Sequence, residues 1–236
     1  MSNRSIHTLL KNWDEECPLT REEAVEVLNL PEEEMDSLME CAYALRTKYK
    51  GKKVSVQLLT NVRSGNCTQN CAYCAQSKDS QAEIEKYKRV SDEKLYGDND
   101  LVDEKHLARH CIGLSGIGFS DEEIEDLADR IREMKKKDTQ ICCSIGFLTE
   151  KQARILKDAG LDRINHNLNS SRSFYPEICT THTYDQRVNN IKMLQSLGFE
   201  ICSGGIVGMG ESKEDIVDML MDLREINPES VPINFL

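Results

Sequence analysis

The hydrophobic and polar positions after residue 50 alternate between two periods. Short apolar runs, typical of buried strands, are followed by amphipathic segments with helical spacing, at intervals of about 30 residues. Strands are expected at 54–60, 110–114, 141–145, 163–168, 200–207 and 230–236, and helices at 120–134, 149–160, 184–197 and 213–226. This alternation predicts parallel βαβ units with right-handed crossovers.

The repeated unit predicts an α/β fold, a TIM-type (βα)8 barrel. Such a barrel has eight strands, and this chain supplies six, so about six βα units are expected. Because the chain stops inside an apolar strand, we expect it to be C-terminally incomplete. Residues 51–236 are assigned to this barrel domain. Residues 1–50 carry helical spacing in acidic segments and are expected to form an N-terminal helical segment packed on the barrel.

The first crossover has a less regular pattern. It is a charged stretch from Glu83 to Glu104 that contains Gly97-Asp98-Asn99-Asp100. These residue types favour turns and weaken helices. We therefore expect a break at Gly97 and a short or bent first crossover.

Three cysteines follow the first strand within eight residues: Cys67, Cys71 and Cys74. In an α/β barrel, the carboxyl ends of the strands form the active face. A structural zinc site would need a fourth protein ligand, and a disulfide would need an oxidising compartment. Thiolates also select iron–sulfur clusters, and three of them leave one iron of a cubane open for reaction. A structural zinc site or a chance grouping of cysteines is the alternative.

The composition excludes several partners. The net charge is −11 and the isoelectric point is near 5.0, whereas nucleic-acid binding requires a basic face. No apolar stretch approaches the length of a membrane span. We expect a cytoplasmic protein that binds neither nucleic acid nor membranes, in which ten cysteines indicate metal or redox chemistry.

Three more cysteines lie on three of the expected strands: Cys111, Cys142 and Cys202. Taken singly, each is more often a small buried apolar residue than a metal ligand. Inward-facing positions on neighbouring strands would bring the three thiols together inside one barrel. The pattern therefore indicates a second, deeper cluster site.

The spacing Cys-x3-Cys-x2-Cys, with an aromatic residue before the last cysteine, resembles the signature of the radical S-adenosylmethionine enzymes. Within that superfamily, the chain resembles the biotin synthases over roughly residues 50–236. The resemblance is carried by the stretches 67–77, 110–113, 164–169, 180–184, 201–211 and 229–234. It implies radical insertion of sulfur into dethiobiotin, which makes the chain a sulfurtransferase that forms biotin.

The resemblance also implies two iron–sulfur cofactors. Cys67, Cys71 and Cys74 would hold a 4Fe-4S cluster whose open iron takes S-adenosylmethionine. An auxiliary cluster, 2Fe-2S or larger, would be the sulfur source, and its catalytic cysteine ligands would be Cys111, Cys142 and Cys202. An electron donor such as flavodoxin or ferredoxin is implied, and a homodimer is expected for the complete protein.

Binding residues follow from the same resemblance, position by position. Residues expected near S-adenosylmethionine are Tyr73, Asn167, Asn169, Arg187, Gly205 and Gly208. Residues expected around the ureido ring of dethiobiotin are Asn165, Asn167 and Asn234. A guanidinium donates two parallel hydrogen bonds to a carboxylate, and an amide both donates and accepts, as a cyclic urea requires. The asparagines could instead bond a loop, and the glycines could serve a tight turn.

Some features leave alternatives open. Asn169 stands where some relatives have Asp, so its contact with a ribose would be neutral. The additional thiols of Cys143 and Cys179 leave the size of the auxiliary cluster undecided. A different radical S-adenosylmethionine enzyme of similar barrel type, or an inactive iron–sulfur-binding fragment, remains a competing interpretation.

Overall fold

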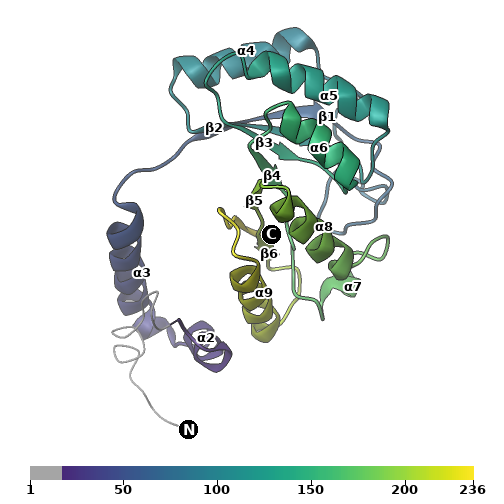
Figure 1. The fold of residues 1–236 in the computed structure, drawn as a ribbon. Helices are drawn as coiled ribbons and strands as arrows, with labels where there is room; N and C mark the ends of the chain where they lie inside the picture. Colours follow the sequence, from purple (N-terminus) through teal and green to yellow (C-terminus); the bar gives the residue numbers. More distant parts are fainter. Residues whose placement is uncertain (1–17) are drawn as a thin grey trace.

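A computed structural model describes residues 18–236. Its centre is a five-stranded parallel sheet in the order β1-β2-β3-β4-β5, with helices packed along one face (Figure 1). The strands are β1 (Gln57–Arg63), β2 (Arg109–Leu114), β3 (Ile141–Ser144), β4 (Arg163–Asn165) and β5 (Glu200–Cys202). The fold is therefore α/β, as predicted, and corresponds to part of a TIM barrel.

The sheet continues past β5 through a second parallel pair, β6 (Gly205–Val207) and β7 (Ile233–Phe235). The expected strand 200–207 is thus divided at Ser203 and Gly204. Both sides of the division still pair with the last segment, because the Ser203 N–H donates to the Ser230 carbonyl and the Gly205 N–H to that of Pro232. A Cβ at Gly204 would collide with the Pro232 carbonyl. The close approach of the two backbones therefore requires glycine here.

Four crossover helices begin and end close to their predicted positions: α5 (Asp121–Met134), α6 (Glu150–Asp158), α8 (Tyr184–Ser196) and α9 (Lys213–Ile226). Each starts with a capping box, in which a Ser or Thr side chain and the side chain three residues later satisfy each other's backbone N–H groups. A short helix, α7 (Tyr175–Ile178), was not predicted. Within residues 18–236, no helix is long and apolar enough to cross a membrane.

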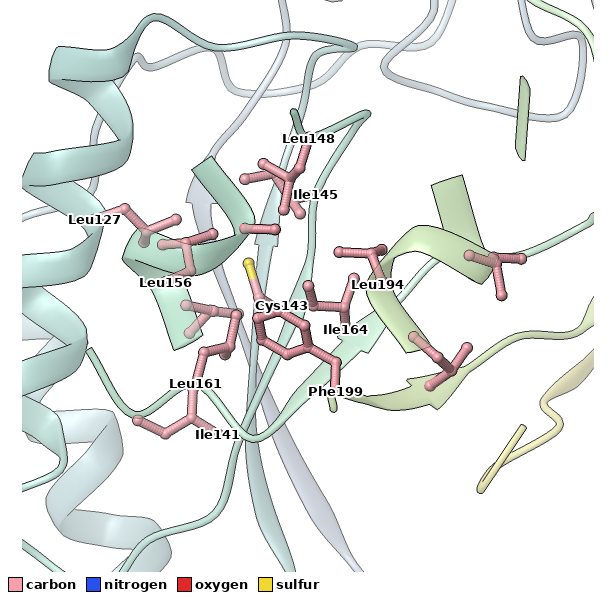
Figure 2. Close-up of a cluster of buried hydrophobic side chains, with 14 of the residues drawn as sticks. Leu127, Ile141, Cys143, Ile145, Leu148, Leu156, Leu161, Ile164, Leu194 and Phe199 are labelled. Atoms are coloured by element: carbon pink, nitrogen blue, oxygen red, sulfur yellow. The ribbon is translucent and has the colours of Figure 1, made fainter. Parts of the chain in front are cut away.

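The hydrophobic core lies between the sheet and the helices (Figure 2). Leu127 of α5 and Leu156 of α6 pack there with Ile164 of β4 and with Phe199. Cys143 of β3 points into this layer and is fully buried. Because side chains alternate along a strand, the preceding Cys142 points to the inner face of the sheet.

The N-terminal segment consists of α2 (Arg21–Leu28), a 3₁₀ turn (Glu32–Glu34) and α3 (Met35–Lys50). Helix α2 contacts α9, where Arg21 Nε lies 2.6 Å from Asp218 Oδ1, but no residue of α2 is buried, and the expected packing on the barrel stays a prediction. No residue of α3 is buried, and this helix stands apart from the sheet in Figure 1. Residues 1–17, including Cys17, lie outside the described part of the chain.

The predicted break at Gly97 is wrong, because α4 (Asp92–Glu104) runs through it. Its polar residues have partners in the fold that the local pattern does not reveal. The Thr60 hydroxyl donates to Asp98 at 2.6 Å, and the Asn99 amide donates to the Met134 carbonyl at 3.2 Å. These buried hydrogen bonds outweigh the low helix propensity of the segment.

Replacing Gly97 by Ala should raise the free energy of unfolding by about 0.5–1 kcal/mol. The residue is helical, and an added Cβ would meet no atom within 4 Å, so alanine would only restrict the unfolded chain. Urea unfolding measures the change. Gly204→Ala is the matched control and should destabilise, since its Cβ would strike backbone. A loss of stability in the Gly97 variant would contradict this account of α4.

Candidate functional site

A cavity of about 300 Å³ opens beside the carboxyl ends of the first four strands. It combines the loop cysteines with polar residues that follow β4 and with a residue of α8. The predicted site residues that line it are Cys67, Cys71, Cys74, Tyr73, Asn165, Asn167, Asn169 and Arg187. Residues separated by more than 100 positions in the sequence thus share one site, because parallel strands end at the same edge of the sheet.

The cysteine loop is anchored to the segment that joins α7 and α8. The Ala72 N–H donates to the Ile178 carbonyl at 2.9 Å, and the Asn70 side-chain oxygen accepts from the N–H groups of Thr180 and Thr181. Cys71 is buried, and Cys67 and Cys74 are half-buried. Burial, followed by the neighbouring Cys179, raises the pKa of the Cys71 thiol to about 12. A metal ion would reverse this preference, because a coordinating thiol is deprotonated.

Arg187 is a half-buried cation at the cavity wall. Its Nε donates to the Tyr175 hydroxyl at 2.5 Å, and its Nη1 donates to the Asn167 carbonyl at 3.0 Å. Its Nη2 donates to Nε2 of His182 at 2.8 Å. In the part of the chain that the structure describes, no carboxylate pairs with it. Three of five N–H groups are used, and a half-buried charge without a counterion in the described chain favours an anionic ligand. The site therefore fits the carboxylate of an amino-acid cofactor.

Asparagines at the end of β4 connect the parts of the site. The Asn165 amide donates to Cys202 Sγ at 3.2 Å, and the Asn167 side-chain oxygen accepts from the Gly204 N–H at 3.1 Å. Asn169 adopts a left-handed conformation (φ 72°) that Asn tolerates, and its amide donates to the Tyr73 hydroxyl at 2.6 Å. These amides are therefore held in defined orientations.

The second cysteine trio lies deeper, on the strands themselves. Cys111 of β2 pairs in register with Cys142 of β3, and Cys202 of β5 pairs with Asn165 of β4. A hydrogen bond with Cys142 and the charges of two arginines lower the pKa of the Cys111 thiol to about 7. One of these arginines, Arg109, has a buried Nη1 without a hydrogen-bond partner in the described structure. Its Nη2 donates to Glu200 at 3.2 Å, so Nη1 is the N–H group left for a ligand, and thiols beside such a donor suit an anionic iron–sulfur group.

The two additional thiols do not join this trio. Cys143 faces the helical layer, on the opposite side of β3 from Cys142, and burial raises the pKa of its thiol. Cys179 lies at the other site, with its Sγ 3.8 Å from Cys71 Sγ. The alternation of side chains along a strand could have shown from the sequence that Cys143 faces the core. No local signal in the sequence connects Cys179 with Cys71. His166 and His182, which also line the cavity, were not recognised as site residues.

Besides the second cysteine trio, three predicted site residues do not line the cavity: Gly205, Gly208 and Asn234. A Cβ at Gly205 would collide with Met219 of α9, so packing alone explains that glycine. Gly208 has φ 102° and donates its N–H to Glu211, which is the tight turn considered as the alternative. Asn234 is exposed on β7. Their contacts with ligands stay predictions.

Comparison with known proteins defines the class. Residues 61–223, more than half of the chain, match the Radical SAM superfamily. The chain therefore belongs to the radical S-adenosylmethionine superfamily, which implies a 4Fe-4S cluster and S-adenosylmethionine as cofactors. The donor set at the cavity, with three thiols and a guanidinium that has no carboxylate partner in the described chain, fits both groups.

Within this class, the curated relatives include biotin synthases. The chain is 41% identical over 219 residues to that of Geobacillus kaustophilus, covering 92% of this chain and 66% of the relative. It is 40% identical to that of Bacillus subtilis, covering 92% of this chain and 65% of the relative. The resemblance predicted from the sequence is confirmed, and the chain spans just under two thirds of the length of these relatives.

Solved structures agree on the fold alone. Methylornithine synthase has a TM-score of 0.84 at 16% identity and covers 96% of this chain and 66% of its own. The hydrogenase maturase HydG from Carboxydothermus hydrogenoformans has a TM-score of 0.81 at 20% identity and covers 98% and 56%. The partial barrel is therefore shared by proteins of different function.

His166 should make the stability of the metal-free chain depend on pH. Burial, followed by the charge of Arg187, lowers the pKa of His166 from 6.5 to about 3. The unfolded chain therefore binds this proton first as the pH falls, and stability is lost below about pH 6.5. Between about pH 7.5 and pH 5 the loss should be about 2 kcal/mol.

Urea unfolding of the His166→Gln variant at both pH values isolates this contribution. The variant should lose about 2 kcal/mol less than the wild type over that interval. His106→Gln, at an exposed position, is the control and should keep the wild-type dependence. Equal losses in wild type and the His166 variant would show that His166 takes up a proton in the folded state.

Proposed function

We propose that this chain carries the catalytic residues of a biotin synthase, which inserts sulfur into dethiobiotin. The observation that supports it most is the arrangement along the inner face of the sheet. The cysteine loop lies at the rim, the second cysteine trio lies on the strands, and Asn165 lies between them, bonded to Cys202. A reaction that needs a radical source and a sulfur source requires two such sites with the substrate between them.

The loop cysteines Cys67, Cys71 and Cys74 would hold the 4Fe-4S cluster. When bound, this group supplies the electron that cleaves S-adenosylmethionine and yields a carbon radical able to remove hydrogen from unactivated carbon. Arg187 would use its remaining N–H groups on the carboxylate of S-adenosylmethionine. Tyr73 and Asn169, held together by their 2.6 Å hydrogen bond, would border the same ligand. The half-enclosed cavity would exclude water from the reacting atoms.

The deeper trio of Cys111, Cys142 and Cys202 would hold the auxiliary cluster, which serves as sulfur source. Arg109 supports this assignment, because its Nη1 is a buried donor without a partner and its charge lowers the pKa of Cys111. With Cys143 in the core and Cys179 beside Cys71, the described chain offers three thiols here. That number favours a 2Fe-2S cluster completed by a ligand from elsewhere.

Asn165 is the residue best placed to bind dethiobiotin. Its amide lies between the trio and the cavity, and a urea needs both a donor and an acceptor. Asn167 and Asn234 would complete the set around the ureido ring. An electron donor such as flavodoxin or ferredoxin, and a homodimer, belong to the same proposal.

Anaerobic reconstitution should load iron and sulfide at two sites. Replacing Cys67, Cys71 and Cys74 together by Ala should remove one optical and Mössbauer signature and leave the other. Replacing Cys111, Cys142 and Cys202 should do the reverse, because the two trios lie on different structural elements. Cys41→Ala, on α3, is the control and should change neither. Loss of all iron together in either triple variant, or zinc in place of iron, would contradict the two-site assignment.

Asn165→Ala should weaken dethiobiotin binding by about 1–3 kcal/mol, or about 5- to 150-fold, because a buried urea would lose a hydrogen bond. Isothermal titration of the reconstituted chain, alone and fused to the remaining third of a relative, measures the affinity. Biotin formation should fall while reductive cleavage of S-adenosylmethionine persists.

The exposed Asn189 of α8 provides the control, since its replacement by Ala should leave dethiobiotin affinity unchanged. If the Asn165 and Asn234 variants both keep wild-type affinity, a radical S-adenosylmethionine enzyme with another substrate is favoured. If the fused protein binds iron but does not cleave S-adenosylmethionine, the chain is an iron-binding fragment without turnover.

A further inference from the structure

Cys179 is a buried thiol that the proposed reaction does not use. Its side chain lies beside the cysteine loop, with Sγ 3.8 Å from Cys71 Sγ. Cys179 is 3% exposed and Cys71 is 8% exposed. Of these two, Cys71 lines the cavity, from which a small reactant can reach it. The two sulfurs therefore form a dithiol with one accessible and one enclosed member.

A mononuclear metal site is the first alternative for this pair. Cys71, Cys179 and His182 have ligand atoms within 4.8 Å of one another. However, Arg187 donates to His182 Nε2, and a guanidinium has no acceptor. The neutral imidazole therefore carries its proton on Nδ1, which faces Gln69 Oε1 at 3.0 Å and Cys179 Sγ at 3.3 Å. That nitrogen has no lone pair for a metal ion, so the geometry favours sulfur chemistry between Cys71 and Cys179.

We propose that Cys71 and Cys179 form a reversible disulfide when no cluster occupies the loop. The two segments are already held together by the bonds from Ala72 to Ile178 and from Asn70 to Thr180. The sulfurs must approach from 3.8 Å to about 2.05 Å, a movement within the reach of side-chain rotation. In the described structure the Cys71 thiol makes no hydrogen bond with the thiol of Cys67 or Cys74, and Cys74 is linked to Cys71 only through its backbone N–H, which donates to the Cys71 carbonyl. Cys179 is the thiol that contacts Cys71 Sγ in the described chain.

The oxidant is a low-molecular-weight disulfide. In the first step Cys71, which lines the cavity, loses its thiol proton and attacks one sulfur of the small disulfide; a mixed disulfide forms and one thiolate leaves with that proton. In the second step the Cys179 thiolate attacks Cys71 Sγ and displaces the second thiolate. Two protein thiols are thereby oxidised and one small disulfide is reduced to two thiols, which take up the two protons that the protein releases.

The consequence is a redox gate on cluster loading. Cys71 cannot bind iron and Cys179 at the same time, so an oxidised chain would load the loop only after a reductant opens the bond. This consequence rests on the proposed 4Fe-4S site, whereas the disulfide itself does not. The same disulfide would protect the Cys71 sulfur from further oxidation.

The test uses the metal-free chain, treated anaerobically with excess oxidised glutathione, alkylated and digested with trypsin without reduction. Cleavage after Arg63 and Lys78 gives peptide 64–78, which contains all three loop cysteines, and cleavage after Arg172 and Arg187 gives peptide 173–187, which contains Cys179 alone. Mass spectrometry should find these two peptides joined. Fragmentation should place the link at Cys71.

Variants make the assignment specific. Cys71→Ala and Cys179→Ala should abolish the linked peptide, whereas Cys67→Ala and Cys74→Ala should retain it. Cys143→Ala, a buried thiol in the helical layer, is the matched control and should also retain it. Cys179→Ser, with circular dichroism of each variant, separates loss of the thiol from loss of the fold.

Two outcomes would overturn the proposal. One is a wild-type chain in which Cys71 keeps glutathione while Cys179 is alkylated. The other is a link from Cys71 to Cys67 or Cys74. After oxidation, the wild type should load no cluster at the loop until dithiothreitol is added, as its optical spectrum would show. The peptide link is measured without iron or dethiobiotin, so a failure of the biotin synthase assignment leaves this result unaffected.

Discussion

The register of the parallel sheet is the constraint on which both cysteine sites depend. Cys111 pairs with Cys142, and Asn165 pairs with Cys202, so three thiols and one amide share the inner face. Successive residues of a strand point to opposite faces. A slip of β3 by one residue would place Cys143 at the inner site and move Cys142 into the core. Core packing around Cys143 therefore also fixes the geometry of the deeper site.

Parallel pairing also fixes the site of the loop cysteines, because it brings the ends of distant strands together. The cysteine loop follows β1, and Asn167 and Asn169 follow β4 at the same edge. The hydrogen bond from Asn169 to Tyr73 and the anchoring of Asn70 by Thr180 close this rim. The loop cysteines therefore lie at the rim and the second cysteine trio lies deeper. Asn165, which lines the cavity and contacts Cys202, lies between the two sites. A substrate held there would face both.

Much of the fold could be predicted because its signals are local. Capping residues such as Ser120 and Ser212 determine where helices begin, and apolar runs determine where strands lie. Helix α4 could not be predicted, because the partners of Asp98 and Asn99 come from β1 and from the end of α5. The loop cysteines were recognisable from spacing alone. The approach of Cys179 to Cys71 depends on tertiary structure, since 108 positions separate them.

Polar groups with incomplete pairing connect stability with ligand binding at both sites. Arg187 has no carboxylate partner in the described chain, and Arg109 Nη1 and His166 Nε2 lack hydrogen-bond partners. Each destabilises the folded chain while it stays unpaired. A bound anion or acceptor removes that penalty and stabilises the fold by an amount linked to its affinity. The unsatisfied groups at the two cysteine sites are therefore the ones whose cost a bound ligand would remove.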